Sequence, residues 1–187
     1  EIPHLICLAI DNDDKLFNSI KKDIEKFVNI MQNCEIHFIS TDGIEKGHVT
    51  EMWNRCFLLG LHKDYDYFLQ CGDDIEFYDG GWENAFVRFL EANQNVGVCG
   101  FSDLNRLKYN QNDRLLTQSF VHKTHFDIFG TYFPKEIKNW GCDDWMTDIY
   151  QINGCCFYSP MHTICNKGGN PRYDIVNNRK LWNELIE

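Results

Sequence analysis

Two adjacent carboxylates, Asp73 and Asp74, are the residues of this 187-residue chain that most clearly suggest chemistry. Adjacent like charges repel each other unless a cation or hydrogen-bond donors neutralise them. Hard divalent cations bind carboxylate oxygens, so the pair indicates a site for a divalent metal with oxygen ligands. An ordinary polar turn is the alternative interpretation, because Asp and Gly are common turn formers.

The sequence around this pair predicts where the carboxylates lie in the fold. The apolar run Tyr67–Leu69 and the following Cys71 are typical of a short buried strand, and Gly72 marks its end. Asp73 and Asp74 then follow the carboxyl end of that strand. In open α/β sheets this edge is where ligands bind.

A second pair, Asp143 and Asp144, occurs in the stretch 140–145, WGCDDW. An aromatic residue and a glycine precede the two acids, and an expected helix continues to Tyr150. Carboxylates in the first turn of a helix are stabilised by the positive end of its dipole. A capped helix start is the simpler interpretation, but it explains one acid more easily than two.

The hydrophobic pattern predicts an α/β fold. Runs typical of strands occupy 5–10, 35–40, 67–71, 96–101, 117–121 and 154–158, and patterns typical of helices occupy 15–31, 50–62, 83–92 and 174–186. We expect the first three strands and the helices between them to form a right-handed parallel unit. The apolar run Leu5–Ile10 is expected to be a central strand buried on both faces. The segment 159–173 is expected to be a long loop.

The polar segment 102–115 holds three basic residues, Arg106, Lys108 and Arg114. We expect it to form a loop near the site, where its basic side chains could contact a diphosphate. A solvated surface loop is the alternative interpretation.

The composition fits one globular domain with a proper core, with 43% hydrophobic and 14% aromatic residues. The net charge of −10 and the lack of a Lys/Arg cluster argue against nucleic acid and against an anionic membrane surface as partners. An acidic protein that binds an anionic ligand needs a local cation, which agrees with a metal site. No apolar run approaches the ~20 residues that span a bilayer, and no signal peptide is recognisable.

Nine cysteines are present, and Cys7, Cys71 and Cys99 lie within apolar runs typical of buried strands. No paired C-x-x-C spacing indicates a zinc site, and Asn-x-Ser/Thr sequons are absent. We therefore expect reduced thiols in a cytoplasmic compartment rather than a disulfide framework. A secretory lumen is the alternative if the chain is a trimmed piece of a longer protein.

The stretch Gly72–Ile75, followed a few residues later by Gly81 and Trp82, resembles the motif of GT-A-fold glycosyltransferases. In that family an Asp-rich strand end, often D-x-D, precedes a Gly-Trp pair. Gly72 stands where the family's first Asp would be, and that Asp usually helps to hold the nucleotide. A second register, Asp74–Glu76, also reads as acid-x-acid.

The resemblance implies a set of nucleotide-sugar contacts. Three acids after strand ends are expected among them, namely Asp11, Asp42 and Asp73. Asp42 matches an acid that commonly contacts the base of the nucleotide, although a turn role is the alternative. Trp53 and Asn54 stand where many of these enzymes carry Arg-Asn before the motif strand, so Asn54 is a further expected contact.

The stretch Trp140–Trp145 is similar to the W-G-G-E-D motif of the β-1,4-galactosyltransferases and to the E-D of other inverting GT-A enzymes. In that pattern the second acid is the general base. Carried over to this chain, Asp144 is the base, and Asp143 and Trp140 contact the acceptor. Asp143 replaces the Glu of the family.

A histidine later in the chain extends the resemblance. In the galactosyltransferase pattern a Met and a nearby His follow the second motif and complete the metal site, and Met161 and His162 follow Asp144 at a similar interval. The resemblance therefore implies Asp74 and His162 as metal ligands. The stretch Asn170–Tyr173 also resembles the N-P-x-R-[FY] of those enzymes. A structural or surface role is the alternative for a lone His.

The resemblance implies a single Rossmann-like GT-A domain of the α/β class over 1–187, with a mostly parallel mixed central sheet flanked by helices. Its nucleotide-binding half is expected at 1–101 and its acceptor and catalytic half at 102–187. The implied activity is Mn²⁺- or Mg²⁺-dependent transfer of a sugar, with inversion, from a UDP- or GDP-sugar to a hydroxyl of a glycan or protein. A retaining transferase of the same fold and a non-catalytic nucleotide-sugar-binding module are the alternatives. A nucleotidyltransferase would need a basic Gly-rich loop near the N-terminus, and the acidic stretch 11–14 does not provide one.

Overall fold

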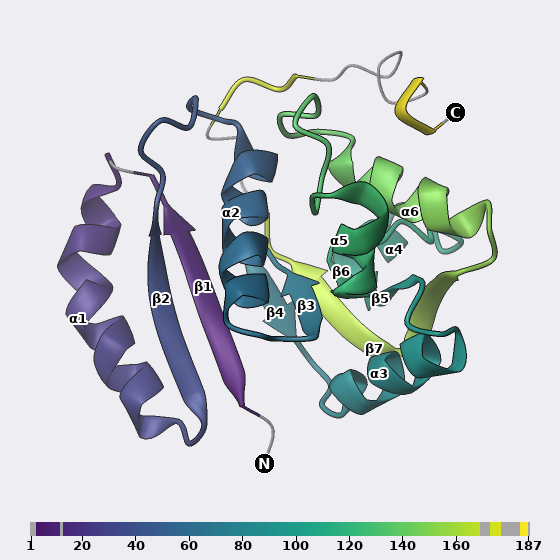
Figure 1. Ribbon diagram of the computed structural model, residues 1–187, viewed down its shortest axis with the longest axis horizontal. Helices are drawn as coiled ribbons and strands as arrows, with labels where there is room; N and C mark the ends of the chain where they lie inside the picture. Colours follow the sequence, from purple (N-terminus) through teal and green to yellow (C-terminus); the bar gives the residue numbers. More distant parts are fainter. Residues whose placement is uncertain (1–2, 12, 169–172, 177–183, 187) are drawn as a thin grey trace.

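The computed structural model describes residues 3–11, 13–168, 173–176 and 184–186 (Figure 1). Its strands are β1 (His4–Ile10), β2 (Cys34–Ser40), β3 (Tyr67–Gln70), β4 (Ile75–Phe77), β5 (Val98–Asp103), β6 (Ser119–His122) and β7 (Cys156–Asn166). Its helices are α1 (Lys15–Ile30), α2 (Val49–His62), α3 (Trp82–Ala92), α4 (Leu104–Leu107), α5 (Thr124–Phe129) and α6 (Cys142–Gln151). The tail helix expected over 174–186 lies largely outside the described residues.

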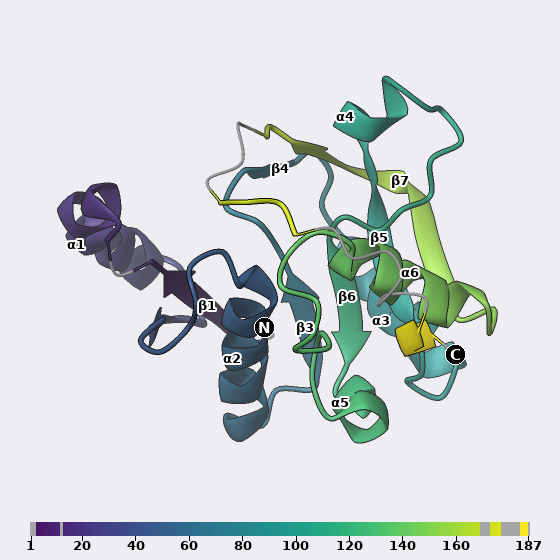
Figure 2. The same cartoon turned by 90° about the horizontal axis from the view of Figure 1, so that it is seen from above.

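The main sheet has five strands in the order β3-β6-β5-β7-β4 and curls into a half-barrel (Figure 2). Only the β5–β7 pair is parallel, and the other three pairs are antiparallel. The expectation of a mostly parallel central sheet is therefore wrong. Apolar runs do not encode strand direction, and the connection 104–118 holds only the short α4, so β6 returns antiparallel to β5 instead of crossing over.

The first two strands form a separate parallel sheet, paired from His4 with Cys34 to Ile10 with Ser40. Residues of β1 are half-buried rather than buried on both faces, and β3 pairs with β6 among the described strands. The expectation that β1 is a central strand of one continuous sheet is thus wrong. Helix α2 packs against β1 and α1 packs against β2, which gives this unit its own local packing (Figure 1).

Helix α1 begins as its sequence predicts but buries only part of its apolar surface. The Asp14 side chain caps it by accepting a hydrogen bond from the backbone N–H of Phe17 at 3.0 Å. Phe17 packs against Phe38 of β2. By contrast, Leu16 and Phe27 are 68% and 66% exposed. Some apolar side chains of α1 therefore pack against β2, while others remain exposed to solvent.

Strand β7 continues to Asn166, although the sequence predicts a loop over 159–173. Its register against β5 shifts between Phe101 and Ser102, which marks a bulge in the ladder. Pro160 lies in this bulge, where its lack of an N–H does no harm. Because Pro160 and the polar residues near it are typical of a loop, the sequence does not predict this part of the strand.

Two cores lie on opposite faces of the main sheet, because alternate residues of each strand point to opposite faces. One core, under α3, holds Phe86, Leu90, Cys99, Phe101, Phe120 and Ile164. The other, under α2, α5 and α6, includes Phe57, Val98, Val121, Tyr132, Phe133, Trp145 and Met146. Neighbouring residues such as Val98 and Cys99 therefore support different helices.

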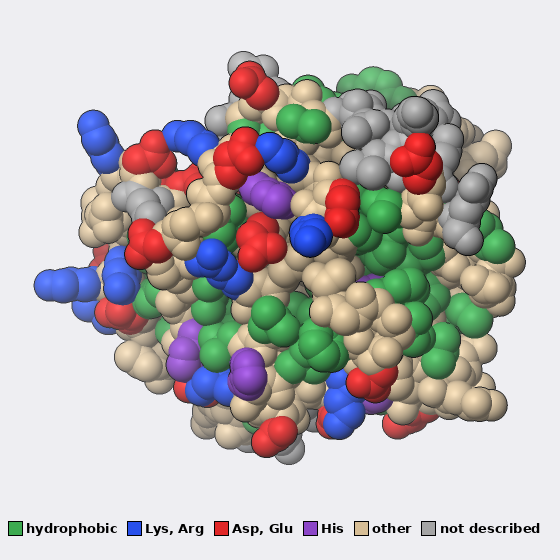
Figure 3. Space-filling view, turned by 45° about the horizontal axis from the view of Figure 1, so that its top comes forward, with side chains coloured by type: hydrophobic (Ala, Val, Ile, Leu, Met, Phe, Trp, Pro, Cys, Tyr) green, Lys and Arg blue, Asp and Glu red, His purple; other side chains and the backbone are tan. Residues whose placement is uncertain are grey.

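Acidic and basic side chains are interspersed over the face of the molecule seen in Figure 3. None of the helices in the described ranges is both long enough and apolar enough to cross a membrane. The nine cysteines are all free in the structure.

Candidate active site

The first carboxylate pair lies in the turn between β3 and β4, where Asp73 and Asp74 are both exposed. The backbone N–H of Gly72 donates to Oε1 of the buried Gln118 at 2.9 Å. The carbonyl of Asp74 accepts a hydrogen bond from the backbone N–H of Lys167 at 2.8 Å. The turn is therefore held on both sides while its carboxylates remain accessible.

Gly72 replaces the first Asp of the family motif, and its surroundings are tight. A Cβ at Gly72 would lie 2.8 Å from Oδ1 of Asp74, so a side chain here would displace that carboxylate. The negative charge of the pair also acts on the thiol of Cys71, which directly follows β3. Burial, and then Asp74 and Asp73, raise the pKa of Cys71 to about 12. The turn thus carries two adjacent acids, with Gly72 where the motif that it resembles has its first Asp.

Asp103, which sequence analysis did not single out, is a buried carboxylate at the end of β5. Its Oδ1 accepts hydrogen bonds from the backbone N–H groups of Asn105 at 2.9 Å and Asn166 at 3.3 Å. Its Oδ2 accepts one from the hydroxyl of Thr117 at 3.3 Å. Asp103 follows an apolar strand just as Asp73 does, and that signal would have identified it.

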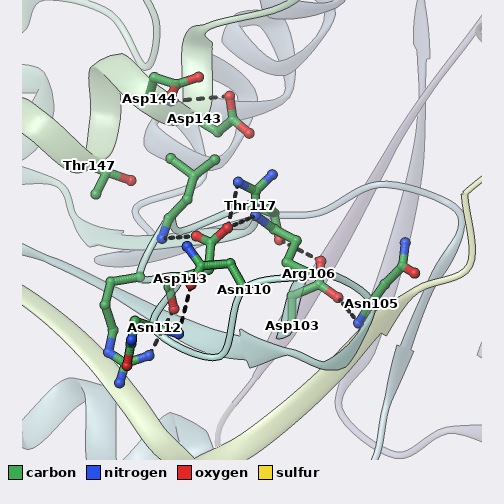
Figure 4. A network of polar contacts seen from close by, with 12 residues as sticks. Asp103, Asn105, Arg106, Asn110, Asn112, Asp113, Thr117, Asp143, Asp144 and Thr147 are labelled. Carbon is green, nitrogen blue, oxygen red and sulfur yellow. Dashed lines mark hydrogen bonds and ion pairs between the residues drawn. The ribbon is translucent and has the colours of Figure 1, made fainter. Parts of the chain in front are cut away.

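The segment 116–118 contacts the elements that carry the two carboxylate pairs. The backbone N–H of Leu116 donates to Oγ1 of Thr147 in α6 at 3.1 Å. The next two residues bind Asp103 and Gly72 through their side chains. The ends of β3 and β5 and the helix α6 thus meet in one region, part of which is drawn in Figure 4.

The second pair occupies the first turn of α6, as expected. Asp144 is exposed, whereas Asp143 is half-buried and accepts a hydrogen bond from the backbone N–H of Asp144 at 3.1 Å. Burial, and then the charge of Asp144, raise the pKa of Asp143 to about 6, while Arg106 acts in the opposite direction. Trp140, just before the helix, is 51% exposed. The turn thus combines a perturbed carboxylate with an accessible one.

The connection between β5 and β6 lies beside Asp143 and is ordered by its own polar contacts (Figure 4). Nε and Nη2 of Arg106 lie 3.0 and 2.9 Å from Oδ2 of Asp113. The guanidinium group of Arg114 lies over the ring of Tyr158, 4.6 Å from its centroid. Arg106 is therefore the basic residue of this connection that acts on the second pair.

Two expected nucleotide contacts, Asp11 and Asp42, lie at one edge of the small sheet. They follow β1 and β2, which pair in register as far as Ile10 and Ser40. The hydroxyl of Thr41 donates to the carbonyl of Ile10 at 2.9 Å and ties the two strand ends together. Both acids are exposed. The structure therefore brings this predicted pair together.

Asn54, a further expected nucleotide contact, serves the fold. It is buried, its Nδ2 donates to the carbonyl of Phe133 at 3.0 Å, and its Oδ1 accepts from the Phe133 N–H at 2.9 Å. It also lines a cavity of about 520 Å³ with Leu58 and Trp145. Both ends of its amide are bound to backbone, so we leave Asn54 out of the proposed donor site.

His162, the expected second metal ligand, lies in the bulge of β7. Its Nδ1 is 2.8 Å from Oγ of Ser159, and its ring packs edge-on against Phe86 with centroids 5.9 Å apart. None of its described contacts involves Asp74. The neighbouring part of the motif that resembles N-P-x-R-[FY], residues 170–172, lies outside the described residues.

The arrangement of these elements has a counterpart among solved structures. The fold is similar to that of a glycosyltransferase. That protein is described as a glycosyltransferase involved in the glycosylation of the major capsid of PBCV-1, and it matches with a TM-score of 0.52 and 10% sequence identity over 84% of this chain and 82% of that chain. No protein family and no curated protein matches the sequence. At this identity the likeness shows the fold, which agrees with the resemblance in the sequence motifs.

In this glycosyltransferase-like fold Asp73 and Asp74 are two adjacent, exposed carboxylates in the turn after β3 that a divalent cation could reach. Across the part of the chain that the structure describes, no three His, Cys, Asp or Glu side chains are grouped to hold a metal. Mg²⁺ is commonly held by one or two carboxylates together with substrate phosphates. The exposed pair fits that mode, in which the diphosphate of a donor supplies further ligands.

Proposed function

We propose that the protein transfers a sugar from a nucleoside-diphosphate sugar to a hydroxyl group of an acceptor, with inversion. The proposal is supported by one segment, 116–118, that contacts both elements bearing the carboxylate pairs. The segment 116–118 joins the end of β3, which precedes Asp73 and Asp74, to α6, which begins with Asp143 and Asp144. The likeness of the fold to a glycosyltransferase supports it.

Direct displacement at a sugar needs two kinds of carboxylate. The acceptor oxygen attacks the anomeric carbon, the bond from that carbon to the diphosphate breaks, and a carboxylate takes the hydroxyl proton. The transition state resembles an oxocarbenium ion, as in glycoside hydrolysis. A bound divalent cation offsets the negative charge that the leaving nucleoside diphosphate gains. One pair can therefore hold the cation while the other supplies the base.

On the acceptor side we assign Asp144 as the base, because its carboxylate is exposed at the start of α6. Trp140 offers an exposed aromatic face on which a sugar ring can pack, and Asp143 can accept a hydrogen bond from an acceptor hydroxyl. Asp143 is the second candidate for the base. Its pKa of about 6 favours it, since an effective base has a pKa near the working pH.

On the donor side we assign Asp73 and Asp74 to the diphosphate and its Mn²⁺ or Mg²⁺, and Asp11 and Asp42 to the nucleoside. The donor is a UDP- or GDP-sugar, and the acceptor is a glycan or a protein. We leave His162 out of the metal site, because its described contacts are with Ser159 and Phe86 instead.

The proposal is tested by incubating the protein with UDP- and GDP-sugars, Mn²⁺ and candidate acceptors. Nucleotide release is measured, and NMR determines the anomeric configuration of the product. We expect release from one class of donor, dependent on Mn²⁺, with inversion. A retained configuration would indicate a retaining transferase. A donor that binds without any release, with all acceptors and with water, would indicate a non-catalytic binding module.

A further inference from the structure

Asn139 is buried one residue before the exposed Trp140, and its amide joins three separate parts of the chain. Its Nδ2 donates to the carbonyls of Gly47 at 3.0 Å and Asp174 at 3.2 Å. Its Oδ1 accepts from the backbone N–H groups of Trp140 at 2.7 Å and Val176 at 3.0 Å. An amide has two donors and two acceptor positions, and here all four are used.

The three parts belong to different sides of the proposed site. Gly47 lies in the loop after β2 that also carries Asp42, and Trp140 opens the segment that leads into α6. Further hydrogen bonds strengthen this junction, because the backbone N–H and the hydroxyl of the buried Thr50 donate to the carbonyls of Lys138 and Ile137. The loop on the nucleotide side is thus fastened to the residues that precede the second carboxylate pair.

The C-terminal segment 173–176 is packed into the same junction. A Cβ added at Gly47 would lie 2.8 Å from Cβ of Tyr173, so the two backbones are close together. Gly47 also has a φ of +82°, which disfavours other residues. In the same loop Gly43 has a similar φ of +76° but open space around it. The two glycines therefore differ in the tail contact and share the backbone constraint.

We propose that Asn139 is a positioning residue that holds Trp140 and the start of α6 against the loop at Gly47. Residues 173–176 are the third segment held at this junction. The inference deepens the proposed function and rests on it for the effect on transfer. No other residue type supplies this set of bonds at the same size. An Asp would place its charge against two carbonyl oxygens and lose both donors, and a Leu would lose all four bonds.

Asn139→Asp is the first test variant, and Asn153→Asp, in the turn just after α6, is its matched control. The side chain of Asn153 donates to the carbonyl of Ile149 in the last turn of that helix. Amide hydrogen exchange measures residues 173–176 and 140–144 directly. We expect faster exchange in both segments for Asn139→Asp and no change there for Asn153→Asp.

Gly47→Ala attacks the same junction without altering Asn139, and Gly43→Ala controls for the strained backbone. We expect Gly47→Ala to speed exchange in residues 173–176 and Gly43→Ala to leave it unchanged. This pair keeps the inference testable if Asn139→Asp does not fold.

In transfer assays we expect Asn139→Asp to lower kcat/KM for the acceptor by about 10- to 100-fold, as expected for misplacing a catalytic group. The Kd for the nucleotide in Mn²⁺ should change less than threefold. Unchanged exchange in residues 140–144 and 173–176, or transfer equal to that of Asn153→Asp, would overturn the positioning role. A wild-type protein that transfers no sugar would overturn the proposed function instead, while the exchange data would still decide whether Asn139 holds the junction.

Discussion

The backbone N–H of Gly72 and Oε1 of Gln118 lie 2.9 Å apart and form a hydrogen bond at the end of β3. Gln118 is buried, and its neighbours reach Asp103 and, through Leu116, helix α6. The turn that carries the first carboxylate pair is thus held by the segment that also contacts the helix of the second pair. If the proposed donor and acceptor sides are correct, their spacing depends on this segment.

Gln118→Leu should weaken donor binding, because it removes the acceptor for the Gly72 N–H and frees the turn at Asp73. Leaving the N–H of the half-buried Gly72 unpaired costs at most about 1–3 kcal/mol, the range for a buried donor, and each 1.4 kcal/mol is about tenfold in Kd. We expect the Kd for the nucleotide in Mn²⁺, measured by calorimetry, to rise about tenfold. Gln111→Leu, in the exposed part of the same connection, is the control. Equal affinities for the two variants would contradict the role of Gln118.

Nucleotide binding should require Mn²⁺ or Mg²⁺, because the strand ends offer the diphosphate two carboxylates. Asp74→Asn should lower the affinity for nucleotide and metal together. His162→Gln should leave both affinities close to those of the wild type, because its described contacts do not include Asp74. Calorimetric titrations in Mn²⁺ and in chelator check this. Equal nucleotide affinity in the two buffers would exclude the metal site, and a large loss in His162→Gln would restore the histidine as a ligand.

Asp143→Asn should stabilise the protein at neutral pH. Burial and Asp144 raise the pKa of Asp143 from 3.8 to about 6. The folded state therefore holds this proton more tightly than the unfolded state does, and the charged form lowers the free energy of unfolding. This penalty is absent below about pH 4, grows between about pH 4 and 6, and is complete above that.

Melting temperatures measured from pH 4 to 8 test whether the charged Asp143 carboxylate destabilises the folded state. The gap between Asp143→Asn and the wild type should open as the pH rises through that window and close towards pH 4. Asp144→Asn should give a smaller gain, because it removes only the weaker cause of the shift. A loss of stability in Asp143→Asn at pH 7.5 would show that its carboxylate is stabilising instead.

The local elements follow closely from the sequence. The helix expected over 50–62 is Val49–His62, and the one expected over 15–31 is Lys15–Ile30. Apolar spacing of three and four and a capping Asp14 are sufficient for this. The placing of two acids at the start of α6 follows for the same reason, since the helix pattern begins directly after Gly141.

The pairing of the strands could not be predicted in this way, because it depends on distant partners. The apolar run of β1 is typical of a central strand, yet β1 pairs only with β2 among the described strands. The roles of Gln118 and Asn139 could not be predicted from the sequence for the same reason. Each is a polar residue in an irregular segment, and its importance appears only once its partners from other parts of the chain are known.

Cys7, Cys56 and Cys156 should react slowly in the folded protein, and all nine cysteines should react after unfolding. Burial raises the pKa of Cys7 and Cys156 to about 11 and that of Cys56 to about 12. The thiolate is the reactive form, so these groups should be inert near pH 8. A thiol-specific reagent, added in buffer and in denaturant without reductant, checks this. Fewer than nine reactive thiols in denaturant would reveal disulfides.

The most direct test of sugar transfer by this site is to measure transfer rate and donor affinity side by side for Asp144→Asn, Asp143→Asn and Asp74→Asn. Asp144→Asn should lose ~10²–10⁴-fold in rate, which is typical for removal of a general base, and should keep its donor affinity. Asp143→Asn should mainly raise the acceptor KM, and Asp74→Asn should weaken donor binding itself. Near-normal transfer by Asp144→Asn would contradict its assignment as the base, and the same loss in Asp143→Asn would move that role to Asp143.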